Sequence, residues 1–292
     1  MRIFWGTSGW QYDDWYGVFY PKEISKQKMF DYYARFYPAV EINSTFYRVP
    51  SEKTAFSWAR KAPKGFRFTL KLHQSFTHDH FLKRNAQTEA EFENFSRVIE
   101  PLRRECLGPI LIQLPPKFSG QHIEALEPFL AMLPTKFRWA LEARNHSLVK
   151  EGAGRVQTLL EKYNTCFCIT DSPLFPDDTC PAWQTTDIAY FRLHGRGQHL
   201  WYDYTYTQPQ LEFWANRIKN IIVSETSLSE IYIFMNNHPN GQALGNMNSL
   251  AALLDLKFTP PIEKTNTSKT SSKTRTELRK QKSIFEFVKK DP

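Results

Sequence analysis

Ionisable and amide side chains recur at the ends of seven short apolar segments. They are Glu41 and Asn43, Thr69, Lys71 and His73, Gln113, Glu142 and Arg144, Asp171, Tyr190, Arg192 and His194, and Asn236. Carboxylates placed among cations are typical of general acid and base chemistry. We therefore take Glu41, Glu142, Lys71 and His194 as candidate catalytic residues.

The basic members of this set indicate an anionic ligand. An arginine can hold a phosphate through two parallel hydrogen bonds, and Lys71, Arg144 and Arg192 supply positive charge. We expect a phosphate or phosphodiester. Further candidates for substrate binding are Thr7, Ser8, Trp10, Asn43, Gln113, Asp171, Asn236 and Asn237. The alternative is an internal network that satisfies only its own charges.

No residue spacing identifies a metal or cofactor. The potential ligands for a divalent metal are His73, His78, Asp79, His80, His194, Asp171 and the two candidate glutamates, but neither HExxH nor paired CxxC occurs. The cofactor is therefore unknown, and a divalent metal stays possible. The turn at residues 195–197 follows an apolar segment. Its sequence fits a phosphate-binding site and a turn without a ligand equally well.

The apolar segments alternate with amphipathic ones, which is typical of repeated βα units around a parallel sheet. The predicted strands are Ile3–Thr7, Val40–Asn43, Phe66–Lys71, Ile110–Leu114, Arg138–Glu142, Thr165–Asp171, Ile188–His194 and Ile231–Asn236. Predicted helices include Gln121–Met132, Ser147–Tyr163, Pro209–Val223 and Asn246–Leu254, and another follows a capping box predicted from Thr88 to Glu91. Eight strands in about 260 residues predict a single-domain α/β protein with the (β/α)8 TIM-barrel fold. The polar strand ends would then meet at one end of the barrel.

Aromatic residues concentrate near the start of the chain, where 17 of the 44 lie within the first 60 residues. Rings in the loop after the first strand, above all Trp10 and Trp15, could line a ligand site. The alternative is a satellite core beneath a long loop.

The charge divides the chain into a barrel, residues 1–258, and a flexible basic tail, residues 259–292. Residues 263–292 carry nine basic and four acidic side chains, so five of the eight net positive charges belong to this segment. The chain lacks an apolar run of about 20 residues and a signal pattern, and its four cysteines show no disulfide spacing. We therefore expect a cytoplasmic protein with reduced thiols and no membrane association.

Several motifs together resemble those of the domain-of-unknown-function family 72, the YecE-like proteins. They are GTSGWQYDDWYGVFYP (6–21), VEINSTFYRVP (40–50), QLPPKF (113–118), LEARNHS (141–147), YFRLHG (190–195) and FMNNHPNGQA (234–243). The resemblance covers roughly residues 1–256 and implies a TIM barrel. It implies no activity, because the family has no established reaction.

The tail ends in a peptide, residues 281–288, that resembles sliding-clamp-binding motifs. Gln281, Ile284 and Phe287 have the spacing of the archaeal and eukaryotic motif, whereas Gln281, Ile284 and Phe285 also fit the bacterial pentapeptide. A short apolar hook on a basic tether suits docking in a groove. The alternative is a final turn that packs back on the barrel.

Three functions remain open from the sequence. The first is a hydrolase that acts on phosphodiester or damaged DNA and is tethered to a sliding clamp. The second is an isomerase or hydrolase of a small phosphorylated or sugar-like metabolite, with Glu41 or Glu142 as base. The third is a non-catalytic nucleic-acid-binding module, whose binding would depend steeply on salt. The oligomeric state is not indicated.

Overall fold

The computed structural model describes residues 1–257, except for the side chains of residues 104 and 105. The predicted tail and its clamp-like peptide, with Gln281, Ile284, Phe285 and Phe287, lie outside the described residues. No helix within residues 1–257 is long and apolar enough to cross a membrane.

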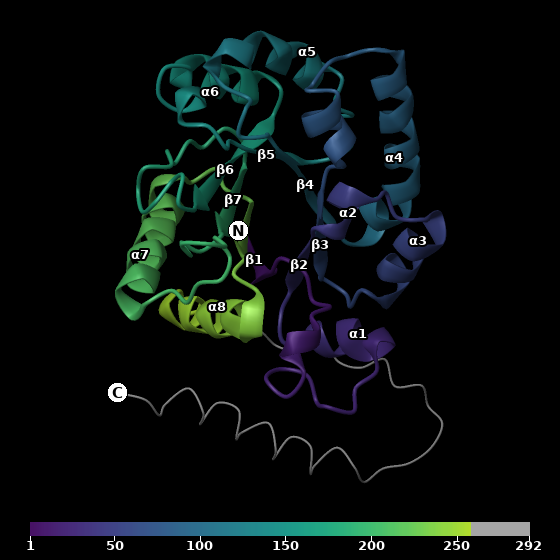
Figure 1. Cartoon of the computed structure of the whole chain (residues 1–292), viewed down its shortest axis with the longest axis vertical. Helices are drawn as coiled ribbons and strands as arrows, with labels where there is room; N and C mark the ends of the chain where they lie inside the picture. Colours follow the sequence, from purple (N-terminus) through teal and green to yellow (C-terminus); the bar gives the residue numbers. More distant parts are fainter. Residues whose placement is uncertain (258–292) are drawn as a thin grey trace. The chain divides into compact units, whose positions relative to one another are not determined.

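Eight parallel strands form a nearly closed barrel, with helices around it (Figure 1). The strands are β1 (Arg2–Thr7), β2 (Ala39–Ile42), β3 (Arg67–Lys71), β4 (Leu107–Gln113), β5 (Trp139–Glu142), β6 (Thr165–Asp171), β7 (Ile188–Leu193) and β8 (Glu230–Met235). Neighbouring strands pair in the order β1-β8-β7-β6-β5-β4-β3-β2. The predicted (β/α)8 barrel is therefore confirmed.

The seam between β1 and β2 depends on a close approach of their backbones. Ser8 and Glu41 form a parallel bridge there, and the Gly9 amide donates to the Glu41 carbonyl over 2.8 Å. Gly6 permits this approach, because a Cβ atom at this position would lie 2.0 Å from the Ala39 carbonyl oxygen.

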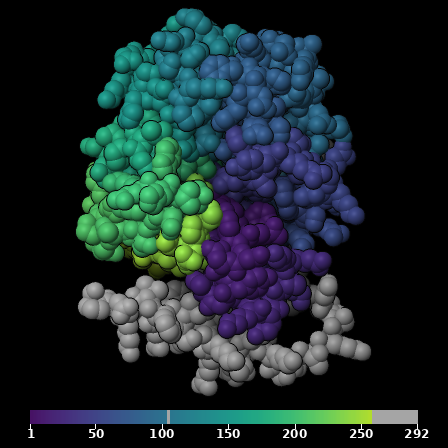
Figure 2. All heavy atoms as spheres, in the orientation of Figure 1, coloured from purple at the N-terminus to yellow at the C-terminus, as the bar shows by residue number. Residues whose placement is uncertain are grey.

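The helices and short helical turns vary in length around the barrel. They are η1 (Asp13–Trp15), η2 (Lys26–Lys28), α1 (Met29–Tyr33), α2 (Ser44–Tyr47), α3 (Glu52–Lys61), η3 (Ser75–Asp79), α4 (Ala86–Glu105), η4 (Gly120–Ala125), α5 (Leu126–Ala131), η5 (His146–Leu148), α6 (Ala153–Lys162), α7 (Gln208–Ser224), η6 (Pro239–Gly241) and α8 (Gln242–Leu253). The N-terminal segment lies beside the yellow-green region that includes α8 (Figure 2), and the Trp15 indole donates to the His238 carbonyl over 2.8 Å.

Three helix starts differ from the predictions, two because of side-chain capping hydrogen bonds and one because of a left-handed glycine. The capping box joins Asn85 and Thr88, not Thr88 and Glu91: each side chain accepts from the backbone N–H of the other. The helix predicted from Ser147 begins at Ala153, since the Asn145 side chain caps the separate turn η5. Conversely, α8 begins at Gln242, directly after a left-handed Gly241.

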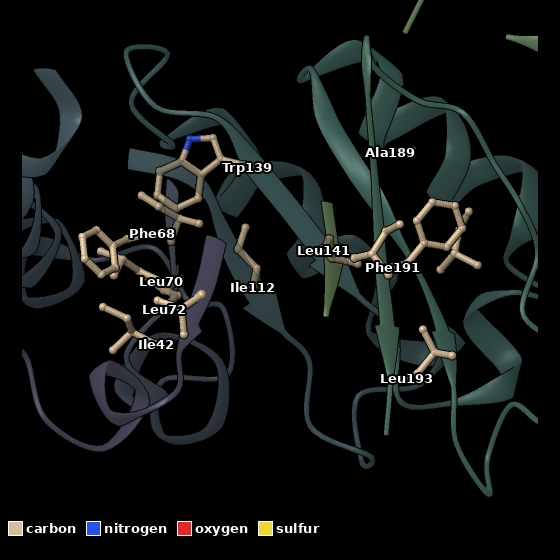
Figure 3. Packing of buried hydrophobic residues seen from close by; sticks show 14 of the residues in the cluster. Ile42, Phe68, Leu70, Leu72, Ile112, Trp139, Leu141, Ala189, Phe191 and Leu193 are labelled. Carbon is tan, nitrogen blue, oxygen red and sulfur yellow. The ribbon is translucent and has the colours of Figure 1, made fainter. Parts of the chain in front are cut away.

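Apolar side chains fill two layers, as the alternation along the strands predicts. The outer layer lies between strands and helices and includes Phe68, Leu70, Ile112, Leu141 and Phe191 (Figure 3). A second cluster holds side chains of the opposite parity: Phe4, Ala39, Leu111, Ala140, Cys166, Cys168, Ile188, Tyr190, Tyr232 and Phe234. This second cluster fills the barrel interior.

The predicted parity of β6 is wrong. Asp171 is predicted to point inward with the other polar strand ends, but Cys166 and Cys168 lie in the interior cluster and Ile169 in the outer layer. In the pairing with β7, Asp171 stands beside Leu193, an outer-layer residue. Because side chains alternate along a strand, a shift of one residue moves Asp171 to the other face.

Candidate functional site

The barrel mouth, which we define as the C-terminal strand ends and the loops that follow them, contains a buried ionic network. Its first half surrounds Glu41 on β2. The carboxylate accepts hydrogen bonds from Ser8 Oγ (2.7 Å), Tyr190 OH (2.6 Å), and Arg192 Nε (3.1 Å) and Nη2 (2.6 Å). Burial alone would raise the Glu41 pKa, but the Arg192 charge and these hydrogen bonds lower it overall. Glu41 is therefore an ionised carboxylate.

The second half surrounds Glu142 at the end of β5. Arg192 Nη1 donates to it, Arg144 Nε lies 2.7 Å away, His194 Nε2 lies 2.8 Å away, and Gln113 Nε2 donates over 3.1 Å. Burial raises the Glu142 pKa, but the neighbouring Arg144 and Arg192 charges lower it well below its usual range. Three hydrogen-bond partners and the Arg144 guanidinium surround this one carboxylate, so it is suited to positioning its neighbours.

His194 connects the network to the end of β8. Asn236 Nδ2 lies 2.9 Å from His194 Nδ1, and the side-chain oxygen of the same amide, Asn236 Oδ1, accepts from Asn43 Nδ2 over 3.3 Å. With Nδ1 as acceptor, the ring proton lies on Nε2 and points to Glu142. Burial and the Arg144 charge lower the His194 pKa to about 4, so the imidazole is neutral at pH 7.

Lys71 is a buried cation of the barrel mouth for which the described residues provide no carboxylate partner. It ends β3 beside Leu111, a residue of the interior cluster, and its side chain is buried. Its Nζ lies 3.5 Å from the centroid of the Phe46 ring. Burial and the charges of Arg192 and Arg144 lower the Lys71 pKa to about 7, despite the opposing effect of Glu142.

The barrel mouth thus brings together most of the predicted site residues. They are Ser8, Glu41, Asn43, Lys71, Gln113, Glu142, Arg144, Arg192, His194 and Asn236. Glu41 and Glu142 were predicted as proton-transfer groups. Their lowered pKa values and saturated contacts favour a positioning role instead.

Four predicted site residues lie in other contacts. The Thr7 hydroxyl donates to the Gly9 carbonyl over 2.7 Å, and the Asn237 amide donates to the Tyr204 carbonyl and to Asn246 over 2.8 Å each. Trp10 packs edge-on against Phe30 and Trp58 and is buried, as in the satellite-core alternative. Asp171 belongs to a separate cluster.

That separate cluster holds the loop after β7 in place. Asp171 pairs with Arg196 (2.6 Å) and accepts from Tyr206 OH (2.6 Å), and Arg196 also pairs with Asp177 (2.6 Å). A Cβ atom at Gly195 would lie 2.4 Å from the Trp201 carbonyl oxygen. The turn at residues 195–197 therefore packs on its own loop, and its arginine already has two carboxylate partners.

The potential metal ligands are dispersed. Among the residues that the structure describes, no group of three or more histidine, cysteine, aspartate or glutamate side chains could hold a metal ion. His73 Nδ1 lies 2.9 Å from Ser75 Oγ, and His80 pairs with Glu91 at 3.1 Å.

Three side chains of the barrel mouth were absent from the predicted site. Tyr190 donates to Glu41, Phe46 lies under Lys71, and the Trp201 ring lies 5.4 Å from the Arg144 guanidinium. Tyr190 lies two residues before Arg192 on β7, so the sequence alone places both side chains on the same face of the strand. Phe46 lies in the short helix α2 after β2, and Trp201 lies in the loop after β7, so the alternation of a strand marks the inward side of neither.

Fold and site define a (β/α)8 barrel with a buried ionic network at its mouth. The chain belongs to the family described as protein of unknown function DUF72, which matches residues 4–271. The predicted family is therefore confirmed.

Two curated bacterial proteins and a crystal structure are similar to this chain. UPF0759 protein YunF of Bacillus subtilis (strain 168) is 25% identical over 281 residues, which cover 88% of this chain and 96% of YunF. UPF0759 protein YecE of Escherichia coli (strain K12) is 28% identical over 120 residues, 41% of this chain and 43% of YecE. The crystal structure of a DUF72 family protein from Thermotoga maritima MSB8 is similar with a TM-score of 0.75 and 32% identity, covering 87% of this chain and 100% of that one.

Proposed function

We propose that the barrel mouth is the active site of an enzyme that acts on a small phosphorylated or sugar-like metabolite. The observation that carries this proposal is the presence of two cationic side chains at the barrel mouth: Lys71, buried against the Phe46 ring, and Arg144, which lies beside the Trp201 ring. Their charges also reach His78 in η3. Lys71, Lys117 and Arg144 all act on its imidazole and, with burial as the largest cause, lower the His78 pKa; Asp79 opposes them. An anion bound beside His78 would offset these charges.

The depth of the reactive groups favours a small ligand. Glu41, Glu142, Arg192, His194 and Lys71 are all buried, while Lys117 is exposed. A metabolite can place an anionic group near Lys117 and Arg144 and its reacting atoms further inside. The phosphodiester backbone of an intact duplex is too wide to reach the same depth.

Binding of phosphorylated compounds tests this proposal. Titration calorimetry with inorganic phosphate and ribose 5-phosphate should show saturable binding that weakens with salt. Lys117→Gln should weaken it about fivefold, as expected for the loss of ~1 kcal/mol of attraction. Lys150→Gln removes another exposed lysine and serves as the control. Equal affinities in the two variants, or no binding of either compound, would contradict the proposal.

A second candidate is hydrolysis of phosphodiester or damaged DNA, with the clamp-like peptide as a tether. The same cations and the net charge of +5 in residues 263–292 favour it. An extruded nucleotide, unlike a paired one, could enter the barrel mouth. Cleavage of abasic, nicked or modified DNA, with or without a divalent metal, would support it. Binding of a peptide of residues 279–292 to a sliding clamp, lost with Ile284→Ala and Phe287→Ala, tests the tether.

A further inference from the structure

Lys71 combines three features that rarely occur together in a lysine. It is only 8% exposed, and one face of its amine is covered by the Phe46 ring at 3.5 Å. Within residues 1–257, no hydrogen-bond acceptor or carboxylate pairs with its Nζ. The Thr45 hydroxyl donates to the Lys71 carbonyl over 2.7 Å, which fixes the end of β3 against α2. The amine is therefore held in place by packing, without a counter-ion.

The nearby carboxylates are already committed to the arginines. Glu41 accepts two hydrogen bonds from Arg192 and two from hydroxyl groups, and Glu142 contacts Arg192, Arg144, His194 and Gln113. Neither carboxylate is available to hold a proton on Lys71. The charged and titratable groups that act on Lys71 or are acted on by it are Arg192 from β7, Glu142 and Arg144 from β5 and its loop, Glu41 from β2, and His78 from η3.

Buried lysines among cations lose their proton easily. Because the Lys71 pKa is lowered to about 7, about half of its side chains are neutral amines at pH 7, against ~0.03% for an ordinary lysine. A neutral amine is a nucleophile, whereas an ammonium group is not. The role of anion ligand falls instead to the Arg144 guanidinium and to the exposed Lys117.

We propose that Lys71 forms an imine with a carbonyl carbon of the substrate, so that the site takes a small anionic aldehyde or ketone. This inference rests on the proposed function and deepens it. The neutral Lys71 nitrogen forms a bond to the carbonyl carbon as the carbon–oxygen π bond breaks, and one proton passes from that nitrogen to the carbonyl oxygen to give a carbinolamine. The carbon–oxygen bond then breaks, and the oxygen leaves as water with one further proton. The product is a protonated imine, and no oxidant or reductant is required.

Neighbouring side chains suit this step. Phe46 excludes water from one side of the amine, and His78 packs edge-on against the same ring with a centroid distance of 5.0 Å. The Thr77 hydroxyl lies 2.8 Å from His78 Nδ1. His78 Nε2 is the nitrogen through which a neutral imidazole could accept or return the protons of the carbinolamine.

Reductive trapping tests the imine directly. The full-length protein is incubated at pH 7 with glyceraldehyde 3-phosphate or glyceraldehyde in the presence of sodium cyanoborohydride, and adducts are located by intact mass and peptide mapping. We expect one dominant adduct on Lys71, formed at least tenfold faster with the phosphorylated aldehyde. Lys71→Met should remove it, while Lys150→Met should not.

A pH series on the wild-type protein keeps the test independent of how well the Lys71→Met variant folds. The rate of Lys71 adduct formation should reach half its maximum near pH 7 and level off above it. Labelling spread evenly over surface lysines, or a Lys71 labelling rate that still rises steeply between pH 8 and pH 9, would overturn the inference.

The two proposals fail in different ways. Binding of ribose 5-phosphate without a Lys71 adduct would overturn the imine and leave the proposed function standing. A Lys71 adduct that forms equally well with both aldehydes would keep the imine and contradict the anionic substrate.

Discussion

The Glu41 carboxylate on β2 accepts two hydrogen bonds from the Arg192 guanidinium on β7, across the interior of the barrel. Arg192 also donates to Glu142 on β5. One side chain therefore compensates two buried negative charges that come from different parts of the chain. Four predictions follow from this network and from the seam beside it.

Replacing Arg192 by methionine should strongly destabilise the protein. The substitution leaves two buried carboxylates facing each other without the charge between them, and breaking a buried ion pair from one side costs about 3–5 kcal/mol. Urea denaturation measures this loss. Arg155→Met is the control, because Arg155 pairs with Glu124 on the surface and should change little. Adding Glu41→Gln to Arg192→Met should recover part of the lost stability; no recovery would contradict the charge argument.

Gly6→Ala should prevent the seam between β1 and β2 from closing. An added Cβ would meet the Ala39 carbonyl oxygen at 2.0 Å and the Tyr33 hydroxyl at 2.6 Å, and the first of these is backbone that cannot turn aside. We expect a loss of at least ~3 kcal/mol in the free energy of unfolding. Gly154→Ala is the matched control, because nothing lies within 4 Å of its added Cβ in α6. That change should be neutral or stabilising by up to about 1 kcal/mol.

Alternation of side chains was sufficient to predict the barrel and most of the site. In β7, Tyr190, Arg192 and His194 alternate with Phe191 and Leu193, so both faces can be read from the sequence alone. In β6 every residue from Thr165 to Asp171 is buried. Its sequence therefore does not indicate which residues face the barrel interior and which face the helices. Its register is set by pairing with β7, which the sequence of one strand does not contain.

The charges within the site were harder to predict than its members. The sequence places Glu41, Glu142 and Lys71 at strand ends, but pKa depends on which charge each group touches. Arg192 and Arg144 form ion pairs with the two carboxylates. Lys71 has no such partner among the described residues, and its pKa is lowered. Pairing of this kind depends on distances across the barrel, and no spacing along the chain encodes them.

Glu142→Gln should lower the Lys71 pKa further. Glu142 is a negative charge that favours the ammonium form, so its removal makes Lys71 easier to deprotonate. The pH of half-maximal reductive labelling should therefore move below 7. Glu127→Gln removes a surface carboxylate that pairs with Lys162 and should leave the profile unchanged. An upward shift in Glu142→Gln would contradict the electrostatic origin of the Lys71 pKa.

His194 should make the folded state less stable in mild acid. Its pKa is lowered to about 4 by burial and by Arg144, whereas an unfolded histidine titrates near 6.5. Between these values the unfolded chain binds a proton that the folded chain does not, so the free energy of unfolding falls as the pH drops from 6.5 to 4. For this one group we expect a loss of about 2 kcal/mol at pH 5 relative to pH 8.

The variant His194→Gln isolates this contribution. The free energy of unfolding from urea denaturation should differ less between pH 5 and pH 8 in His194→Gln than in the wild-type protein. Because burial also lowers the pKa values of His78 and His238, the wild-type slope alone is not diagnostic, and the difference between the two proteins is the quantity to measure. An unchanged slope in His194→Gln would mean that His194 is protonated in the folded state, with Glu142 as its counter-ion.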